Sequence, residues 1–229
     1  MIVRDFYIEA MKLRYFVGIN QIKFDLNQFL KANEIHDEEE ALNYVFNIIK
    51  ELQDKNEKST LQFIADKYVL NQDHIFNACY YMQKAFFHKT HISNKKNIEL
   101  MLYLSTSRQI SKGIESFGID YYDLKEGNII ICIISPIDNL NKINKEILQI
   151  LGANEIELTI NSLTIEKINT IIDYYEFSNS QIKSVLNSYG NKKSIIADFK
   201  NNLESLSLAI FDLICEKMAL LNIEKTKKN

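Results

Sequence analysis

Hydrophobic residues recur along this chain at two spacings, and each spacing predicts one kind of element. Runs that alternate or are continuously apolar, and that are rich in β-branched and aromatic residues, predict strands. These runs are Val3–Ile8, Leu13–Ile19, Leu61–Val69, Ile129–Ile134 and Ile156–Ile160. The fourth run is apolar on both faces, so we expect it at the centre of a sheet. The first two are expected to pair as a hairpin.

Apolar residues spaced three and four apart predict helices between and after these strands. We expect them at about 37–52, 71–87, 97–105, 107–117, 140–151, 164–177, 179–189 and 194–222. Together the two patterns predict a mixed α/β (α+β) fold, with a small central sheet, flanking helices and a long C-terminal helix. With 229 residues, of which 46% are hydrophobic, the chain is long enough to bury this core as a single domain over residues 1–229.

The last predicted helix carries more apolar surface than one packing seam requires. A heptad-like seam is formed by Phe199, Leu203, Leu206, Ile210 and Leu213. A second apolar edge adds Ile196, Ile214, Met218 and Leu221. Two explanations fit: the helix is packed deeply in the fold, or one side of it binds a partner. For a partner, we expect Met218 and Leu221 to be exposed.

Two predicted helices meet at Ser105-Thr106-Ser107, in the middle of the stretch Asn97–Ile119. Thr106 followed three residues later by Gln109 is a capping-box pattern, and Gly118 is expected to end the second helix. This places Arg108 in a first helical turn, beside unpaired backbone N–H groups and the positive end of a helix dipole. An anion such as a phosphate is the expected ligand.

A structural role for Arg108 is the alternative, because the side chain could hold a nearby carboxylate or cap the C-terminus of a helix. Composition favours function slightly. Only three of the 27 basic residues are arginine, at positions 4, 14 and 108, so lysine is used where a simple charge suffices. Arginine offers a planar fork of donors that lysine lacks.

A basic segment precedes this stretch. Lysines and histidines gather around Phe86 and Phe87, at Lys84, Lys89, Lys95, Lys96, His88 and His91. Basic residues interleaved with aromatic rings are typical of single-stranded nucleic-acid binding, although lysines on a solvated loop give the same pattern. We discount a metal site at His88 and His91, which have no third ligand nearby in sequence. The acidic run 37–40 is interpreted as a helix start and not as a metal site.

The net charge and the lack of catalytic motifs limit the functions that this sequence can have. The formal net charge of -3 excludes a whole-molecule basic field, so nucleic-acid binding has to be local. The three cysteines are far apart and fit reduced thiols. We find no catalytic motif and expect neither an enzyme nor a cofactor or metal. No signal peptide or apolar run of about 18 residues is present, so we expect a cytoplasmic protein that does not contact the membrane.

Several local strings resemble the PRPK-binding protein family, in its archaeal type, a subunit of the tRNA-modifying KEOPS complex. The strings are HIFNA (74–78), HISN (91–94), IELML (98–102), SRQI (107–110), FGI (117–119) and EKMALL (216–221). The resemblance covers about residues 61–225 and, with the first strands, nearly the whole chain. The stretch 25–58 departs from it and is interpreted as a helical insertion.

The resemblance implies a non-catalytic subunit that binds the small PRPK-type kinase-like subunit of KEOPS and the 3′ CCA end of tRNA. The complex makes threonylcarbamoyladenosine next to the anticodon. Carried over by motif, the tRNA-binding residues are Lys89, His91, Ile92, Ser93, Asn94, Lys95, Arg108 and Gln109. On the terminal helix, the partner-binding residues are Leu213, Lys217, Met218 and Leu221. A purely structural adaptor that binds the kinase without touching tRNA is the alternative.

Overall fold

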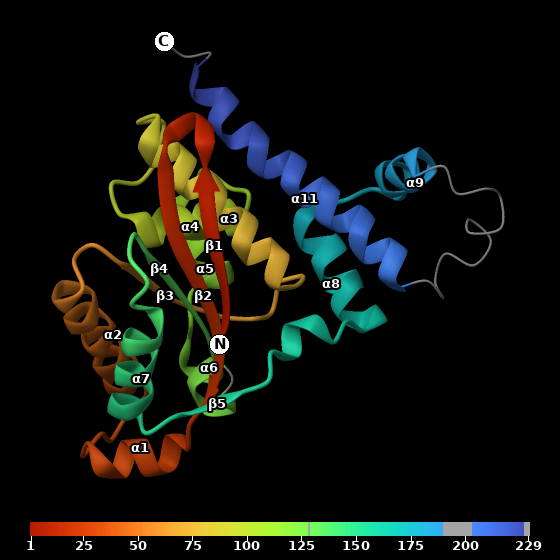
Figure 1. Cartoon of the computed structure of the whole chain (residues 1–229). Coiled ribbons are helices and arrows are strands. Elements are labelled where there is room, and N and C mark those ends of the chain that lie inside the picture. Colours follow the sequence, from red (N-terminus) through yellow and green to blue (C-terminus); the bar gives the residue numbers. More distant parts are fainter. Residues whose placement is uncertain (128, 190–202, 227–229) are drawn as a thin grey trace. The chain divides into compact units, whose positions relative to one another are not determined.

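The computed structural model describes residues 1–127, 129–189 and 203–226, with side chains described through Leu221. A five-stranded antiparallel sheet has the order β1-β2-β4-β3, and β5 pairs with the C-terminal end of β2 (Figure 1). The strands are β1 Ile2–Ile8, β2 Leu13–Lys23, β3 Thr60–Ile64, β4 Ile129–Ser135 and β5 Asn154–Ile156. The predicted mixed α/β class, the hairpin and the central position of the fourth run are confirmed.

The chain divides into two compact units, and each unit recruits three separate stretches. The sheet unit consists of residues 1–66, 95–97 and 117–159, and the helical unit of residues 67–94, 98–116 and 160–229. The expected single domain over residues 1–229 stays a prediction.

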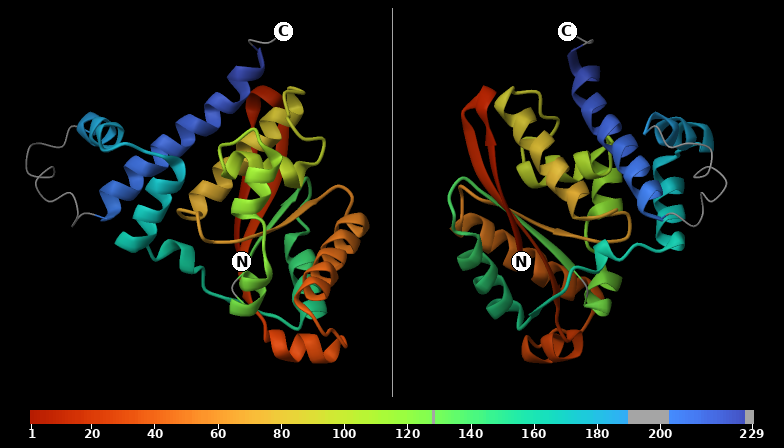
Figure 2. Two further views of the ribbon diagram at one scale, coloured as in Figure 1. Left: turned by 180° about the vertical axis from the view of Figure 1, so that it is seen from behind. Right: turned by 45° about the vertical axis from the view of Figure 1, so that its right-hand side comes forward.

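The core of the sheet unit lies between the sheet and helices α1 (Leu26–Ala32), α2 (Glu38–Lys55), α6 (Tyr121–Glu126) and α7 (Leu140–Leu151). The stretch 25–58 forms α1 and α2, which contribute buried side chains such as Phe29 and Val45 to this core. As predicted, Asp37 caps α2 by accepting a hydrogen bond from the Glu40 amide. Lys55 and Glu146 form an ion pair between α2 and α7, which lie side by side (Figure 2).

The helical unit contains α3 (Gln72–Phe87), most of α4 (Lys96–Leu104), α5 (Ile110–Phe117), α8 (Ile165–Tyr175), α9 (Asn179–Ser188) and α11 (Leu203–Thr226). At 24 residues α11 is the longest described helix, and it contacts α3, α8 and α9. It continues unbroken past Leu206, as predicted. The predicted start at Ser194 lies outside the described residues, as do Ile196 and Phe199.

His74 joins three helices of this unit at its centre, and it is completely buried. Its Nδ1 accepts a hydrogen bond from the Leu70 amide at 3.2 Å, so Nε2 carries the proton and donates to the Leu104 carbonyl at 3.2 Å. The Tyr175 hydroxyl donates to the same carbonyl. Burial lowers the pKa of His74 to about 4, although the Leu104 carbonyl acts in the opposite direction.

Two predicted strands are longer than the observed ones. The strand predicted at Leu61–Val69 ends at Ile64, and the strand predicted at Ile156–Ile160 is replaced by β5 and a short 3-10 turn at Thr159–Asn161. The Gln21 side chain explains the second difference. Its Oε1 accepts a hydrogen bond from the Thr159 amide at 2.7 Å and replaces a strand partner there. Among the described helices, none is long and apolar enough to cross a lipid bilayer.

Candidate functional site

A groove of about 480 Å³ lies in the helical unit, between the turn that joins α4 to α5 and one side of α11. We call it the cationic groove. Its lining residues are Thr106, Ser107, Arg108, Gln109, Lys112, Lys217, Leu220 and Leu221. Three of them are cations and none is a carboxylate. Of the residues predicted to bind tRNA, this groove brings Arg108 and Gln109 together.

The turn on the first wall is built by a helix-ending motif at Thr106. The Ser107 amide donates to the Leu102 carbonyl and the Thr106 amide to the Tyr103 carbonyl, which is the hydrogen-bond pattern of a Schellman motif. Thr106 has a φ of 49°, a left-handed conformation that is unfavourable for a β-branched residue. The turn therefore fixes the direction in which Ser107 and Arg108 leave α4.

The predicted capping box at this turn is wrong, because Thr106 ends α4 and does not begin α5. The hydroxyl that accepts from the Gln109 amide is that of Ser107, at 3.1 Å. Helix α5 begins only at Ile110, so Arg108 lies in the turn before the helix and not in its first helical turn. Two apolar residues of this helix, Ile110 and Ile114, are exposed.

Arg108 reaches across the groove to the second wall. Its Nη1 donates a hydrogen bond to the Leu221 carbonyl of α11 at 2.7 Å. The structural alternative is thus partly correct, since the side chain holds a helix carbonyl. A carbonyl carries no net charge, however, so the guanidinium keeps its full positive charge and further N–H donors for a ligand.

Neutral groups also hold the two lysines of the groove. The Lys217 ammonium donates to the Tyr175 carbonyl at 2.7 Å and lies 5.2 Å from the centroid of the Phe177 ring. The Lys112 ammonium lies 5.6 Å from the centroid of the Tyr174 ring. Carbonyl oxygens and ring faces attract cations without neutralising them. These contacts orient both ammonium groups while their charges remain available.

The surroundings of the groove disfavour the charged form of Lys217. Burial lowers the pKa of its ammonium, Glu176 offsets part of this effect, and the positive charge of Lys112 lowers the pKa further. Within the described part of the chain, no carboxylate forms an ion pair with any of the three cations. An anion bound here would relieve the repulsion between Lys112 and Lys217. The arrangement is suited to holding a phosphate.

The basic loop after α3 is built differently from the groove. Another Schellman motif ends α3, where Lys89 has a φ of 56° and the Thr90 amide donates to the Ala85 carbonyl. The Ile92 and Ser93 amides both donate to one carboxylate oxygen of the buried Glu99, at 2.9 and 2.7 Å. Glu99 therefore occupies these two backbone donors, which are not available to a phosphate.

The side chains of this loop have unequal access to a ligand. Lys89, Asn94 and Lys95 are exposed, whereas Ser93 is buried and His91 is half-buried against the Phe86 ring. None of the six predicted loop residues lines the cationic groove.

Most of the residues expected to bind a partner on the terminal helix are buried. Leu213, Met218 and Leu221 are buried, so the expectation that Met218 and Leu221 are exposed is wrong. They belong to the packed side of α11, which contacts α3, α8 and α9. Every fourth residue instead faces solvent and forms a continuous line on the helix. We call it the α11 stripe: Glu204, Leu208, Asp212, Glu216 and Leu220.

Sequence reasoning missed Lys112, and it missed Lys217 as part of a cationic site. Lys112 had a signal in the sequence, because it follows Arg108 by four residues and Gln109 by three. Lys217 comes from a segment more than one hundred residues away, so only the packing of α11 brings it to the groove. The α11 stripe also had a signal, since its five members are spaced by four.

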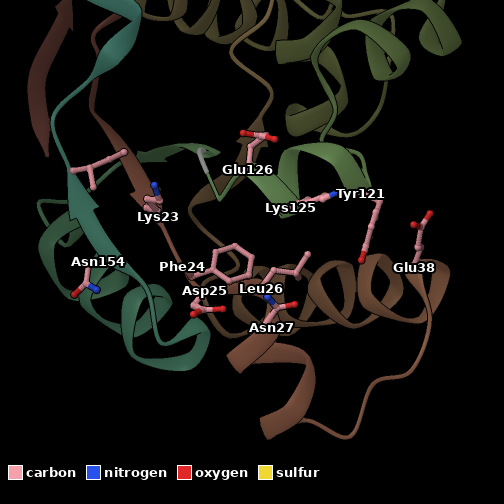
Figure 3. Close-up of a pocket in the computed structure, with 11 residues that line it drawn as sticks. Lys23, Phe24, Asp25, Leu26, Asn27, Glu38, Tyr121, Lys125, Glu126 and Asn154 are labelled. Carbon is pink, nitrogen blue, oxygen red and sulfur yellow. The ribbon is translucent and has the colours of Figure 1, made fainter.

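A second groove, of about 770 Å³, lies in the sheet unit, and we call it the mixed-charge groove (Figure 3). Its lining comes from the end of β2, the starts of α1 and α2, helix α6 and strand β5. Two cations, Lys23 and Lys125, lie among three carboxylates, those of Asp25, Glu38 and Glu126. All five are exposed. No group of three or more His, Cys, Asp or Glu residues in the described chain is arranged to hold a metal ion.

Comparison with known families gives one match. The model of the family described as kinase binding protein CGI-121 matches residues 23–222, most of the chain. The match includes the cationic groove and the α11 stripe. No curated protein matches the chain.

Proposed function

Because the chain belongs to the CGI-121 family of kinase-binding proteins, we propose that it is a non-catalytic adaptor that joins a kinase-like protein to the 3′ CCA end of tRNA. The observation that carries the RNA part of the proposal is the cationic groove. Arg108, Lys112 and Lys217 line it together, and each is oriented by a carbonyl or an aromatic ring instead of a carboxylate.

A single-stranded RNA end fits this groove better than a duplex does. The net charge of -3 gives little general attraction for a polyanion, so affinity has to come from a few local contacts. A flexible end can turn its phosphates toward three converging cations. Its bases can lie against the exposed apolar side chain of Leu220 on the opposite wall.

The resemblance of the sequence to the PRPK-binding protein of KEOPS gives this adaptor a biological setting. We propose that the partner is the PRPK-type kinase-like subunit and that the complex makes threonylcarbamoyladenosine in tRNA. In this setting the chain holds the acceptor end while another subunit performs the chemistry near the anticodon. We expect the complex to act in the cytoplasm.

The α11 stripe is the surface that we assign to the kinase-like partner, in place of the buried residues. Leu208 and Leu220 are 54% and 47% exposed, whereas the other apolar residues described on α11 are buried or half-buried. Glu204, Asp212 and Glu216 alternate with them and favour a partner with a basic surface. Leu208→Glu is expected to abolish co-purification with the partner without unfolding the chain, which circular dichroism would check.

The decisive test of RNA binding compares intact tRNA with tRNA trimmed of its CCA end at one fixed salt concentration. We expect trimming to remove most of the affinity of the wild-type chain. Arg108→Ala should weaken binding of intact tRNA by about 1–3 kcal/mol, and Arg108→Lys should restore part of the loss, since the charge returns without the fork.

Lys125→Ala is the matched control, because it removes an exposed cation from the mixed-charge groove and should leave tRNA affinity unchanged. If trimming the CCA end leaves wild-type affinity unchanged, the site assignment is wrong. If intact tRNA does not bind at all while the partner does, the chain is the purely structural adaptor.

A further inference from the structure

Leu220 belongs to two surfaces of the helical unit at once. Its side chain lines the cationic groove, and it is also the last member of the α11 stripe. The two surfaces that we assign to RNA and to the kinase-like partner therefore meet on one turn of one helix. A ligand on either surface changes the surroundings of the other.

The charges near Leu220 determine whether a ligand on one surface strengthens or weakens binding on the other. Glu216 lies one helical turn before Leu220 and is the neighbour in sequence of Lys217, which lines the groove. Side chains four residues apart on a helix are close, with Cβ atoms roughly 5–6 Å apart. The exposed Glu216 carboxylate therefore repels a phosphate bound in the groove when α11 is free. A basic surface seated on the stripe would neutralise this carboxylate.

Arg108 links the position of α11 to the geometry of the groove. Its hydrogen bond to the Leu221 carbonyl, at 2.7 Å, fixes the guanidinium only while this turn of α11 stays in place. A partner that binds the stripe would hold the same turn. The guanidinium would then keep this orientation as RNA arrives, which reduces the cost of binding.

We propose that the α11 stripe and the cationic groove are positively coupled, so that a basic, kinase-like partner on the stripe increases the affinity of the groove for the RNA end. This inference rests on the proposed function of both surfaces. Linkage requires the reverse effect as well: bound RNA increases the affinity for the partner by the same factor.

The test measures binding of a labelled single-stranded RNA oligonucleotide ending in CCA, with and without a saturating amount of the kinase-like subunit. We expect at least about fivefold tighter binding in its presence. Glu216→Gln should tighten RNA binding to the isolated chain and reduce the ratio between the two affinities. The ratio should also shrink as salt is raised, because it depends on charge.

Glu38→Gln is the matched control. It removes one exposed carboxylate that belongs neither to the α11 stripe nor to the cationic groove, but lines the mixed-charge groove of the sheet unit. It should leave RNA affinity and the ratio unchanged. Both glutamates are exposed, and circular dichroism would check that both variants fold.

The outcomes separate the two proposals. A ratio of one, or weaker RNA binding in the presence of the partner, overturns the coupling while both binding functions stand. Loss of RNA binding under every condition refutes the proposed function instead. An equal effect of Glu38→Gln and Glu216→Gln would also overturn the coupling, since it would show a general charge effect and not a shared turn of α11.

Discussion

The two grooves described above rank differently by volume and by suitability for an anion. The mixed-charge groove has a volume of about 770 Å³ and the cationic groove about 480 Å³. The larger one places exposed cations and carboxylates side by side, so their charges largely cancel. The smaller one gathers three cations and orients each with a neutral group. Volume alone would select the wrong site, whereas uncompensated, oriented charge selects a site for an anion.

The largest effect should come from removing both lysines of the cationic groove. Charge-assisted contacts contribute about 1.5–3 kcal/mol each, so Lys112→Ala with Lys217→Ala should weaken RNA binding by about 3 kcal/mol or more. That is roughly a hundredfold increase in Kd. Fluorescence anisotropy with a CCA-ended oligonucleotide would measure it.

The matched double variant is Lys23→Ala with Lys125→Ala in the mixed-charge groove, where we expect no change in RNA affinity. An equal loss in both double variants would mean that RNA responds to total charge, and the distinction between the grooves would fail.

The pH dependence of stability should distinguish the two units through one titratable group in each. In the helical unit, the pKa of His74 is about 4 in the folded state and 6.5 in a model compound. The unfolded chain therefore takes up a proton first, and stability falls as the pH drops from 6.5 to about 4. The loss is on the order of 3 kcal/mol. Urea unfolding at a series of pH values would measure it, and His74→Gln should remove this pH dependence.

Asp123 in the sheet unit has the opposite sign. Burial raises the pKa of its carboxyl to about 6, although the hydrogen bond from the Asp120 amide lowers it, and the negative charges of Asp120 and Asp66 add to the increase. The folded state therefore binds this proton more tightly, and stability falls as the pH rises from 3.8 through about 6. Solvent screening reduces this effect, because the carboxyl is only half-buried. Asp123→Asn should flatten it, and a variant that instead steepens the profile would show that the carboxyl is stabilised by its charge.

A smaller effect, on the free energy of unfolding, is expected at Thr106, which ends α4 at the wall of the cationic groove. Thr106 is β-branched and left-handed, so Thr106→Gly should stabilise the chain by about 0.5–1 kcal/mol after the entropic cost of glycine. Lys89, at the equivalent position after α3, is also left-handed but unbranched, so Lys89→Gly should stabilise it less. Chemical denaturation would compare them. A larger gain for Lys89→Gly would show that branching is not the source of strain.

The smallest effect concerns the pH dependence of RNA binding. Burial lowers the pKa of Lys217, so its charge is lost at a lower pH than that of an exposed lysine. Affinity in the cationic groove should therefore decline as the pH rises toward the ordinary lysine pKa of 10.5. Lys217→Arg keeps its charge there and should bind RNA with the same affinity across this range. A decline in both proteins would assign the pH effect to another group.

The periodicity of apolar residues was sufficient to predict helices and strands. It was not sufficient to predict which side of a helix is buried. The Ile129–Ile134 run is β4, and the spacing of apolar residues correctly marked α7 and the long last helix. The same spacing did not tell which apolar residues of α11 are buried. Most of its apolar residues are covered because α3, α8 and α9 pack against it, and this depends on contacts between distant segments.

The candidate site was predicted only in part for the same reason. Arg108 and Gln109 were identified from a local turn, although the type of the turn was wrong, because a left-handed Thr106 is rare and the sequence gives no sign of it. The second wall of the groove comes from α11. Neither Lys217 nor the Leu221 carbonyl has any relation in sequence to Arg108, so their meeting could not be predicted from local patterns.

Each unit is assembled from three separate stretches of chain. The cationic groove can therefore form only after the last of its stretches has been synthesised. The turn around Arg108 is translated about halfway along the chain, but the carbonyl that orients it belongs to Leu221. A nascent chain on the ribosome therefore has the α11 stripe and both walls of the cationic groove only after α11 has been translated. A product truncated before Lys217 would lack the second wall, so by the proposed function it would not hold RNA ends unproductively.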